Sequence, residues 1–173
     1  MELIPLLFDN VIFEKESYIV ESDGKYGVYS FSNNVLLLPC EYESVCLIEY
    51  KVEHTFTHDT KYAFLCTKDG KKGVFDKEGT QILECKYEDI CPLEVAYRGI
   101  PDYRGYILKQ NGYYGWWTHD QGQISEFLYD SIKPYNDENF GCYLVVQDVA
   151  ESVDLDFKIP CPGYLSMEIH SHV

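Results

Sequence analysis

The stretch from Cys66 to Ile90, CTKDGKKGVFDKEGTQILECKYEDI, contains two turn signals, two short apolar runs and a closing tyrosine. Its first turn is Asp69-Gly70. An Asp-Gly pair between apolar residues is a strong β-hairpin signal, because glycine adopts positive φ without steric cost. Gly73 follows three residues later. We expect it either to complete a bulged turn or to let another part of the chain approach the backbone closely.

The same pattern occurs twice more, as VESDGKYGVYSFSNNVLLLPCEYESV at Val20–Val45 and as LKQNGYYGWWTHDQGQISEFLYDSI at Leu108–Ile132. Repeats of this length decide the architecture of a chain. At the second turn, Asn33 is expected to take the place that glycine holds in the other copies, because Asn tolerates a left-handed conformation. The glycines that we expect at the structural turns are Gly24, Gly27, Gly70, Gly73, Gly112 and Gly115.

Each unit closes with an aromatic residue, an acid, a spacer and a β-branched aliphatic. The closings are Tyr42-Glu43-Ser44-Val45, Tyr87-Glu88-Asp89-Ile90 and Tyr129-Asp130-Ser131-Ile132, and the N-terminus supplies Phe8-Asp9-Asn10-Val11. Because these acids recur in phase with the turns, we expect them to have a structural role at the unit ends. Tyr143 to Val146 resembles the first strand of a further unit, but no glycine pair follows it. Atypical terminal units are expected to shield the ends of a repeat stack from water.

The sequence therefore predicts an all-β fold of tandem antiparallel β-hairpin repeats. These would form a curved open sheet, a barrel-like closure or a solenoid array, and spacing does not distinguish them. We expect a single domain. Its parts are a half-unit at 1–14, repeats at about 15–45, 60–90 and 104–132, and a degenerate acidic C-terminal unit at 133–173. Two longer excursions, at Cys46–Thr60 and Pro92–Arg104, join the repeats. The first reads as a strand pair, and Gly99, Pro101 and Asp102 are loop signals in the second.

The repeat resembles the WG repeat family, also called the KWG repeat, in its Gly-x-x-Gly pair, aromatic or aliphatic pair, turn glycine and Tyr-acid-x-aliphatic ending. The resemblance covers about residues 18–132. Tyr26, Lys72 and Tyr114 replace the tryptophan that gives the family its name. The resemblance implies β-hairpin repeats, often bacterial, mostly without known enzymatic activity.

Charge limits the class of partner. The chain has 173 residues, with 14 basic and 29 acidic ones and a net charge of −15. Because phosphates require cations, this balance excludes nucleic acid and anionic membranes as expected partners. It is compatible with a basic partner reached by electrostatic steering, and equally with simple solubility.

The expected compartment is the cytoplasm. The N-terminus has no basic segment followed by a long apolar run, and no apolar run is long enough for a membrane helix. The seven cysteines include two equivalent pairs, Cys40 with Cys85 and Cys46 with Cys91. We interpret them as small buried apolar residues in a reducing environment.

No motif predicts catalysis, a cofactor or a metal site, and we expect a protein that is not an enzyme. His54 and His58 have the spacing of zinc ligands on a helix, but the local pattern is strand or loop. The sequence has no Cys-x-x-Cys pair and no nucleophile motif beside a histidine.

Two surfaces are candidates for binding a partner. One is acidic and C-terminal: Asp137, Glu138, Asp148, Glu151, Asp154 and Asp156. The other is an aromatic hairpin set in which Tyr113, Tyr114, Trp116 and Trp117 are the main candidates, joined by Tyr26, Tyr29, Lys71 and Lys72. The alternative interpretation is repeat packing for the aromatic hairpin set and a solvated face for the acidic stretch, since charge runs are usually solvated. Trp117 is the first candidate for an exposed anchor.

The sequence best fits a non-enzymatic protein-binding β-repeat protein, in its sharpest form a bacterial immunity protein that binds and neutralises a basic toxin. The alternative is a carbohydrate- or other ligand-binding module or adaptor that uses the Tyr/Trp-rich face. A homodimer through exposed strand edges is also compatible with the pattern.

Overall fold

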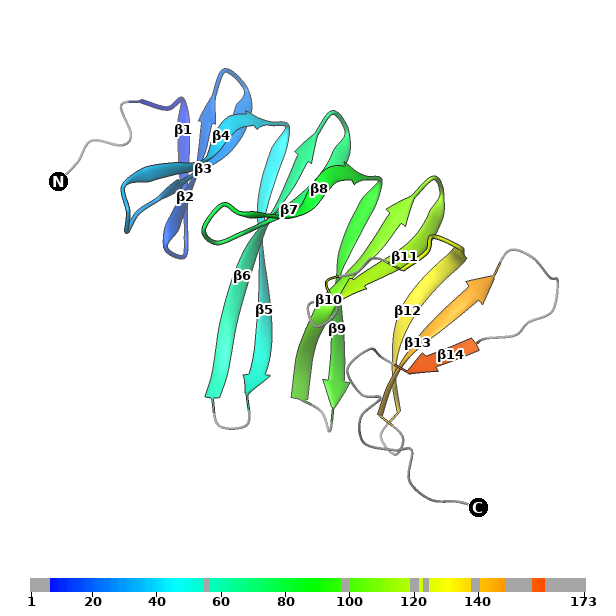
Figure 1. Cartoon of the computed structure of the whole chain (residues 1–173). Helices are drawn as coiled ribbons and strands as arrows, with labels where there is room; N and C mark the ends of the chain where they lie inside the picture. Colours follow the sequence, from blue (N-terminus) through cyan, green and yellow to red (C-terminus); the bar gives the residue numbers. More distant parts are fainter. Residues whose placement is uncertain are drawn as a thin grey trace, which may run out of the picture. The chain divides into compact units, whose positions relative to one another are not determined.

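A computed structural model describes residues 7–54, 57–97, 100–118, 122, 125–137, 141–148 and 157–160, with side chains at 7–49, 61–93, 105–118, 122 and 125–132. The described residues form strands and turns and no helix (Figure 1). The strands are β1 (Asn10–Glu14), β2 (Ser17–Ser22), β3 (Lys25–Ser30), β4 (Val35–Tyr42), β5 (Ser44–His54), β6 (Thr57–Lys68), β7 (Lys71–Asp76), β8 (Gln81–Tyr87), β9 (Asp89–Tyr97), β10 (Ile100–Gln110), β11 (Tyr113–Thr118), β12 (Tyr129–Asp137), β13 (Gly141–Asp148) and β14 (Phe157–Pro160).

These strands form three sheets, with the orders β1-β2-β3-β4, β5-β6-β7-β8 and β14-β13-β12-β11-β10-β9. Neighbours in each order follow one another in the chain, and the recorded pairings are antiparallel. The structure therefore confirms the all-β fold of tandem hairpins. The chain passes from one sheet to the next at the closing motifs, between β4 and β5 and between β8 and β9.

The Asp-Gly and Asn-Gly pairs form the predicted hairpin turns. Ser22 pairs with Lys25 across the first turn, so Asp23 and Gly24 form a two-residue loop. Both have positive φ, 52° and 70°. The same two-residue loop joins β6 to β7 and β10 to β11, where both loop residues again have positive φ. Two successive positive φ angles are the mark of a type I′ turn, whose twist matches that of the flanking strands.

The second turn of the first unit corrects one expectation. The left-handed residue is Asn34, with φ 55°, and not Asn33. Asn34 corresponds to Gly79 and Gly122, whose φ angles are 84° and 61°. The first unit has one more residue between Gly27 and this position than the second has between Gly73 and Gly79. Counting residues from the glycine pair, with the spacing of the second copy, therefore placed the left-handed residue one position too early.

The second glycine of each pair lies opposite a bulge. Val28 pairs with Leu38 and Tyr26 pairs with Tyr42, so residues 39–41 all lie opposite Gly27. A Cβ atom at Gly27 would lie 2.5 Å from the Leu38 carbonyl oxygen. The second unit repeats this arrangement at Gly73. Of the two roles expected for this glycine, the structure shows the close approach of another part of the chain.

Both excursions between repeats are hairpin extensions. β5 runs to His54 and β6 begins at Thr57, as the strand-pair interpretation predicted. The loop expected around Pro101 and Asp102 is wrong, because Pro101 pairs with Ala96 and Asp102 pairs with Val95 within β9 and β10. Gly99 lies outside the described residues. Loop signals failed here because β10 pairs with β11 only from Gly105 onward, so the part of β10 that contains Pro101 pairs with β9 on one side and tolerates a proline as an edge does.

The chain begins a fourth unit with β12. Ile132 pairs with Val146, as Ile90 pairs with Leu108 and Val11 pairs with Val20. The first strand expected at Tyr143–Val146 is therefore confirmed as part of β13. Val146 also pairs with Phe157, which takes the position that the second glycine holds in the complete units.

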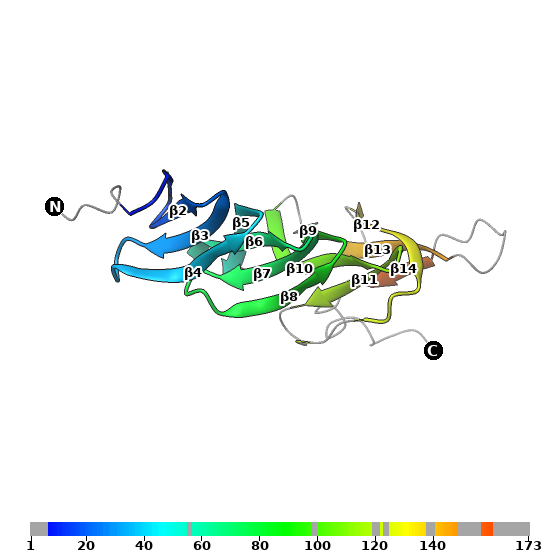
Figure 2. The same ribbon diagram turned by 90° about the horizontal axis from the view of Figure 1, so that it is seen from above.

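Contacts divide the chain into two compact units, residues 1–49 with 62–87 and residues 50–61 with 88–173. In the first of these compact units, the β1–β4 sheet lies beside β7 and β8 (Figure 1 and Figure 2). One face of that sheet, with Ile19, Val28 and Leu38, joins a core that includes Phe64 and Phe75 of the second sheet. In the second compact unit, the buried apolar side chains among the described residues are Ile90, Leu93, Tyr106, Ile107, Leu108 and Ile132. A single domain remains a prediction.

Candidate functional site

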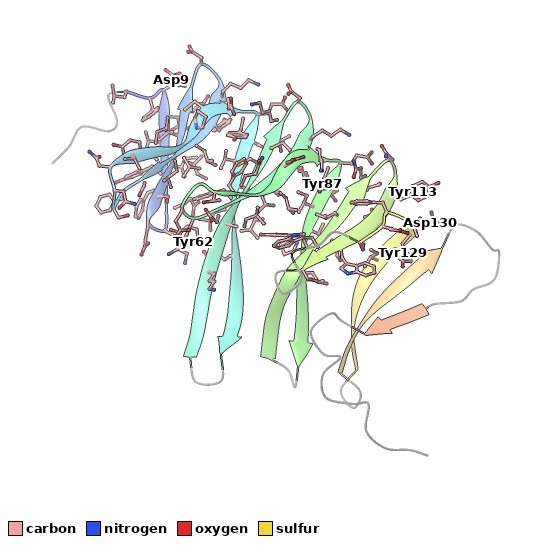
Figure 3. The ribbon with its side chains drawn as sticks, viewed as in Figure 1. Asp9, Tyr62, Tyr87, Tyr113, Tyr129 and Asp130 are labelled. Carbon is pink, nitrogen blue, oxygen red and sulfur yellow. The ribbon has the colours of Figure 1, made fainter. Side chains whose placement is uncertain are left out.

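The acids of the closing motifs bind the turn of the following hairpin. Asp9 Oδ2 accepts a hydrogen bond from the Asp23 backbone N–H at 2.8 Å. Glu43 Oε2 accepts one from Gly70 at 3.1 Å, and Glu88 Oε2 accepts one from Gly112 at 3.1 Å. Figure 3 labels Asp9 at the end of the first sheet where this turn lies. We call this contact the turn clasp.

A backbone hydrogen bond accompanies each turn clasp. The N–H groups of Asp9, Glu43 and Glu88 donate to the carbonyl groups of Glu21, Thr67 and Lys109 at 2.8, 2.7 and 2.8 Å. The shorter aspartate reaches the first turn residue, whereas the two glutamates reach the second. The turn clasp therefore gives the in-phase acids the structural role expected for them.

The aromatic hairpin set does not form one exposed surface. Trp116 stacks on Tyr129 with ring centroids 5.7 Å apart, and Trp117 stacks on Tyr106 at 5.8 Å. Successive residues of a strand point to opposite faces of the sheet, so the two tryptophans lie on different faces. Both are half-buried. Trp117 is therefore partly covered and not fully exposed, and its role in binding a partner stays a prediction.

The remaining members of the set are also separated. Tyr113 is exposed, and Figure 3 labels it near the start of β11. The Lys109 ammonium lies 5.2 Å from the centroid of the Tyr114 ring. In the first repeat, the Tyr29 hydroxyl donates a hydrogen bond to Asn34 Oδ1 at 2.6 Å. Lys71 and Lys72 are half-buried at the start of β7.

Two members of the predicted acidic surface, Asp137 and Asp148, have described backbone positions. Asp137 ends β12 and pairs with Gly141, whereas Asp148 ends β13 and pairs with Tyr129 at the start of β12. The two aspartates lie at opposite ends of one hairpin, roughly 25 Å apart at about 3.4 Å per residue. Their side chains, and all of Glu138, Glu151, Asp154 and Asp156, lie outside the described part of the chain.

A groove that the sequence did not predict lies in the first compact unit. It has a volume of about 740 Å³. Its walls come from β1, β2 and β3 of the first sheet and from residues 43–49 at the start of the second. Its lining combines apolar side chains with three carboxylates: Ile12, Ile19, Tyr26, Val45, Leu47, Glu14, Glu43 and Glu49. Sequence reasoning missed it because its two walls come from different sheets.

The charges of this acidic groove are only partly compensated. The Lys15 ammonium lies 3.0 Å from Glu49 Oε1, and both side chains are about half exposed. Glu43 also holds the turn clasp. Ile12 is 46% exposed. Both β1 and β5 are edge strands of their sheets, so the groove runs between two sheet edges.

The cysteines differ in environment. Cys66 is buried, and burial raises the pKa of its thiol above the ordinary value, with a smaller contribution from Cys85 and Cys46. Cys40 and Cys85 are half-buried, and burial is also the main reason why their pKa values are raised. Cys46 and Cys91 are exposed, so the expectation that these two are buried is wrong. They follow a buried residue in β5 and β9, and the strand alternation turns them outward.

Within the described ranges, no group of three or more His, Cys, Asp and Glu residues is placed to hold a metal ion. His54 ends β5 and His58 is the second residue of β6. Both therefore lie in strands, and the surface loop expected for this pair is wrong. Their side chains lie outside the described residues, so their exposure stays a prediction. No helix in the described residues could cross a membrane.

Comparison of the chain with family models, with curated proteins and with solved structures finds no match.

Proposed function

We propose that this chain is a non-enzymatic protein-binding β-repeat protein whose partner is basic. The observation that carries the proposal is the acidic groove, whose lining combines Glu14, Glu43 and Glu49 with apolar side chains. This combination suits a segment that alternates basic and apolar side chains. An extended segment of that kind presents the two sorts of side chain to opposite sides, one set toward Ile12 and Val45 and the other toward the carboxylates.

The edge strands offer the partner a backbone as well as side chains. β1 and β5 each pair with one neighbour in their sheet. An extended peptide can add to such an edge through main-chain hydrogen bonds, while pockets beside the strand select its side chains. The acidic groove supplies such pockets along both edges.

The Lys15–Glu49 ion pair is easily replaced. Both of its side chains are about half exposed. Exposed pairs of this kind contribute about 0–1 kcal/mol. A partner lysine or arginine could therefore take the place of Lys15, and a bidentate arginine would bind the carboxylate more strongly.

The charge of the whole chain favours the same partner. A net charge of −15 accelerates association with a basic protein and slows it with an acidic one. A bacterial immunity protein that neutralises a basic toxin is the most specific form of this proposal. We also propose that the chain is a degenerate member of the WG repeat family, since the turn clasp and the bulge opposite the second glycine recur in phase with the motif.

Glycan or planar-ligand binding through the aromatic hairpin set is less well supported. Trp116 and Trp117 are stacked on tyrosines of their own unit and lie on different faces of the sheet. A stacking platform needs several exposed rings on one face.

A defined probe tests the acidic groove. We would titrate a labelled, capped peptide of alternating Lys and Val residues against the full chain and follow fluorescence anisotropy at low and at 0.5 M salt. The expected result is binding that weakens strongly with salt, as screening requires. The charge-reversed variant Glu14→Lys/Glu49→Lys should bind at least about tenfold more weakly, as for a lost pair of charge contacts.

The matched control is Glu78→Lys/Glu84→Lys, at two exposed carboxylates that pair with Lys77 and Lys86 outside the groove. It should change the affinity about twofold or less. Equal losses in both variants would mean that net charge, and not the groove, binds the peptide. The toxin hypothesis is then tested by capture from the host at low salt. A stoichiometric basic partner that the groove variant fails to capture and the control variant retains would support it, whereas an absence of partners at either salt concentration would favour a ligand-binding module.

A further inference from the structure

The turn of the third hairpin is the one place in the sequence where glycine follows asparagine, at Asn111-Gly112. The equivalent turns of the first and second repeats are Asp23-Gly24 and Asp69-Gly70. All three are two-residue loops with positive φ at both positions, 54° and 85° in the last of them. Asparagine and aspartate both suit this turn, so its backbone does not distinguish the amide from the acid.

An asparagine that is followed by glycine can modify itself. The backbone nitrogen of the glycine loses its proton and attacks the Cγ carbonyl carbon of the asparagine, so a C–N bond forms and the side-chain nitrogen leaves as ammonia. The product is a cyclic succinimide. Water opens this ring at either of its carbonyl groups and leaves aspartate, or isoaspartate, in which the main chain runs through the side-chain carbon atoms. The chain and water are the only reactants.

Two features of the turn permit this reaction. Asn111 and Gly112 are both exposed, so water reaches them. Glycine has no side chain to hinder its own nitrogen, and nothing lies within 4 Å of the position that a Cβ atom at Gly112 would take. The other asparagines are followed by Val, Asn, Asp or Phe. On steric grounds alone, Asn111 is therefore the asparagine of this chain that deamidates most readily.

The turn clasp of the third hairpin holds the nitrogen that has to attack. The Gly112 N–H donates to Glu88 Oε2 at 3.1 Å. The Glu88 N–H donates to the Lys109 carbonyl group at 2.8 Å, which keeps Glu88 beside the turn. The nitrogen becomes reactive when it loses its proton and gains negative charge, and a neighbouring carboxylate opposes that charge. Since a carboxylate is a far weaker base than an amide anion, it keeps this proton in place and does not remove it.

We propose that Asn111-Gly112 is a site of spontaneous deamidation whose rate is set by the Glu88 carboxylate. While the turn clasp is closed, the Gly112 nitrogen is hydrogen-bonded and unreactive. When the turn clasp opens, this nitrogen can attack the side chain of Asn111. The rate of the reaction therefore depends on how often the third hairpin opens.

The two products have opposite effects on the hairpin. Aspartate reproduces the turn of the other repeats, where Asp69 already precedes the glycine that Glu43 binds. We expect the fold to accept this product, with one added negative charge. Isoaspartate adds an atom to the main chain within a two-residue loop, which displaces the Gly112 N–H from Glu88. We expect this product to keep the turn clasp open.

Peptide mapping by mass spectrometry tests the proposal on the full chain during incubation at mildly alkaline pH. The mass change from amide to acid measures the conversion of Asn111, and chromatography separates aspartate from isoaspartate. Glu88→Ala should deamidate at least about fivefold faster than the wild type, because one hydrogen bond no longer has to break first. The matched control, Glu43→Ala, removes the turn clasp of the second repeat. It should change the rate less than about twofold, since distant sites act independently.

Two further variants and the unfolded chain separate the causes. In Glu88→Gln the amide oxygen still accepts the hydrogen bond but does not oppose the negative charge, so its rate should lie between those of the wild type and Glu88→Ala. The wild type unfolded in urea should react fastest. Asn111→Asp reproduces one product and should unfold at the same urea concentration as the wild type, whereas the purified isoaspartate form should unfold at a lower one.

Equal rates in the folded and the unfolded wild type would overturn the proposal, because the fold would then give no protection. A slower reaction in Glu88→Ala and Glu88→Gln would also overturn it, since Glu88 would then accept the proton and promote the attack. Equal acceleration in Glu88→Ala and Glu43→Ala would assign the effect to a general loss of stability. A large loss of stability in Asn111→Asp would contradict the claim that the fold accepts the aspartate product.

Discussion

Gly27, Gly73 and Gly115 hold the same position in three successive hairpins, and at Gly27 and Gly73 the facing backbone leaves no space for a side chain. A Cβ atom at Gly73 would lie 2.7 Å from the backbone nitrogen of Cys85 and 2.8 Å from the Leu83 carbonyl oxygen. The first glycine of the pair has a different requirement, since nothing lies within 4 Å of a Cβ atom at Gly70 but its φ is +68°. One glycine is needed for space and the other for backbone conformation.

We therefore predict that Gly73→Ala destabilises the fold by about 1–3 kcal/mol, because the backbone of the bulge must move to admit the methyl group. Gly70→Ala should cost about 1–2 kcal/mol, through its positive φ. Urea unfolding followed by circular dichroism measures both. Gln81→Ala, at an exposed site on β8, is the control and should stay within about 0.5 kcal/mol. A Gly73→Ala variant as stable as this control would contradict the steric argument.

Two buried groups of the first compact unit make the free energy of unfolding depend on pH in the alkaline range. Burial is the largest cause that raises the pKa of the Cys66 thiol from 9.0 and that of the Tyr42 hydroxyl from 10.0. Both groups are neutral when protonated. Above pH 9 the unfolded chain therefore loses protons that the folded chain retains, and the free energy of unfolding falls as pH rises.

We predict that stability is constant below pH 9 with respect to these groups and decreases progressively above it. Urea unfolding between pH 7 and pH 11 measures the decrease. Cys66→Ala should make the decrease above pH 9 less steep, since it removes one of the groups. Gln81→Ala, at an exposed site without a titratable group, should leave the pH profile unchanged. If both variants had the wild-type slope, the thiol of Cys66 would not contribute.

At the scale of the secondary-structure elements, the turn clasp connects one unit to the next. Glu43 follows β4 and holds the turn between β6 and β7 through both its side chain and its backbone. Ser44 adds a hydrogen bond from its hydroxyl to Thr67 Oγ1 at 3.0 Å. The closing motif thus fixes where the next hairpin lies, which explains why its acid recurs with the turn.

We predict that Glu43→Ala destabilises the fold by about 1 kcal/mol, the ordinary effect of losing one hydrogen bond to a backbone N–H. Glu43→Gln should cost less, because its amide oxygen can still accept the bond. Chemical unfolding measures both variants. The control is Glu84→Ala, which removes the exposed pair with Lys86 and should cost about 0.5 kcal/mol or less. Equal effects of Glu43→Ala and Glu84→Ala would show that the turn clasp has no special contribution.

At the scale of the whole molecule, the excess of carboxylates opposes the compact state. The chain carries 29 acidic and 14 basic residues, and like charges repel more strongly when the chain is folded. Ion pairs such as Lys68–Glu41 at 2.8 Å offset only part of this repulsion. The same excess supports the proposed basic partner, so stability and binding respond to salt in opposite directions.

We predict that raising the salt concentration from about 0.02 to 0.5 M increases the unfolding temperature by a few degrees, because the screening length falls. Differential scanning fluorimetry at low micromolar protein measures the shift. A variant with Glu16→Gln, Glu126→Gln and Asp130→Asn removes three exposed charges and should show a smaller shift. A salt response as large in the variant as in the wild type would point to a cause other than self-repulsion.

The sequence by itself determined the hairpins and their turns. Asp23-Gly24, Asp69-Gly70 and Asn111-Gly112 have the turn conformation that their residue types require, because positive φ is decided within two residues. The closing motifs and the strand at Tyr143–Val146 were likewise visible, since a repeat shows its phase without any tertiary contact. The left-handed residue Asn34 was predicted one position too early, because an extra residue in a turn shifts the spacing while the residue types that favour the turn stay the same.

The tertiary structure alone decided which residues are exposed and which meet. Phe64 and Tyr18 hold equivalent positions, yet Phe64 is buried and Tyr18 only partly so, because the first sheet packs on that face of the second sheet, whereas the described residues place no sheet on the equivalent face of the first. Asp137 and Asp148 are close in the sequence but lie at opposite ends of a hairpin, whereas Glu14 and Glu49 line one acidic groove from two different sheets. Turn chemistry acts over a few residues, but burial and charge clustering depend on what packs against each face, and only the packed chain contains that information.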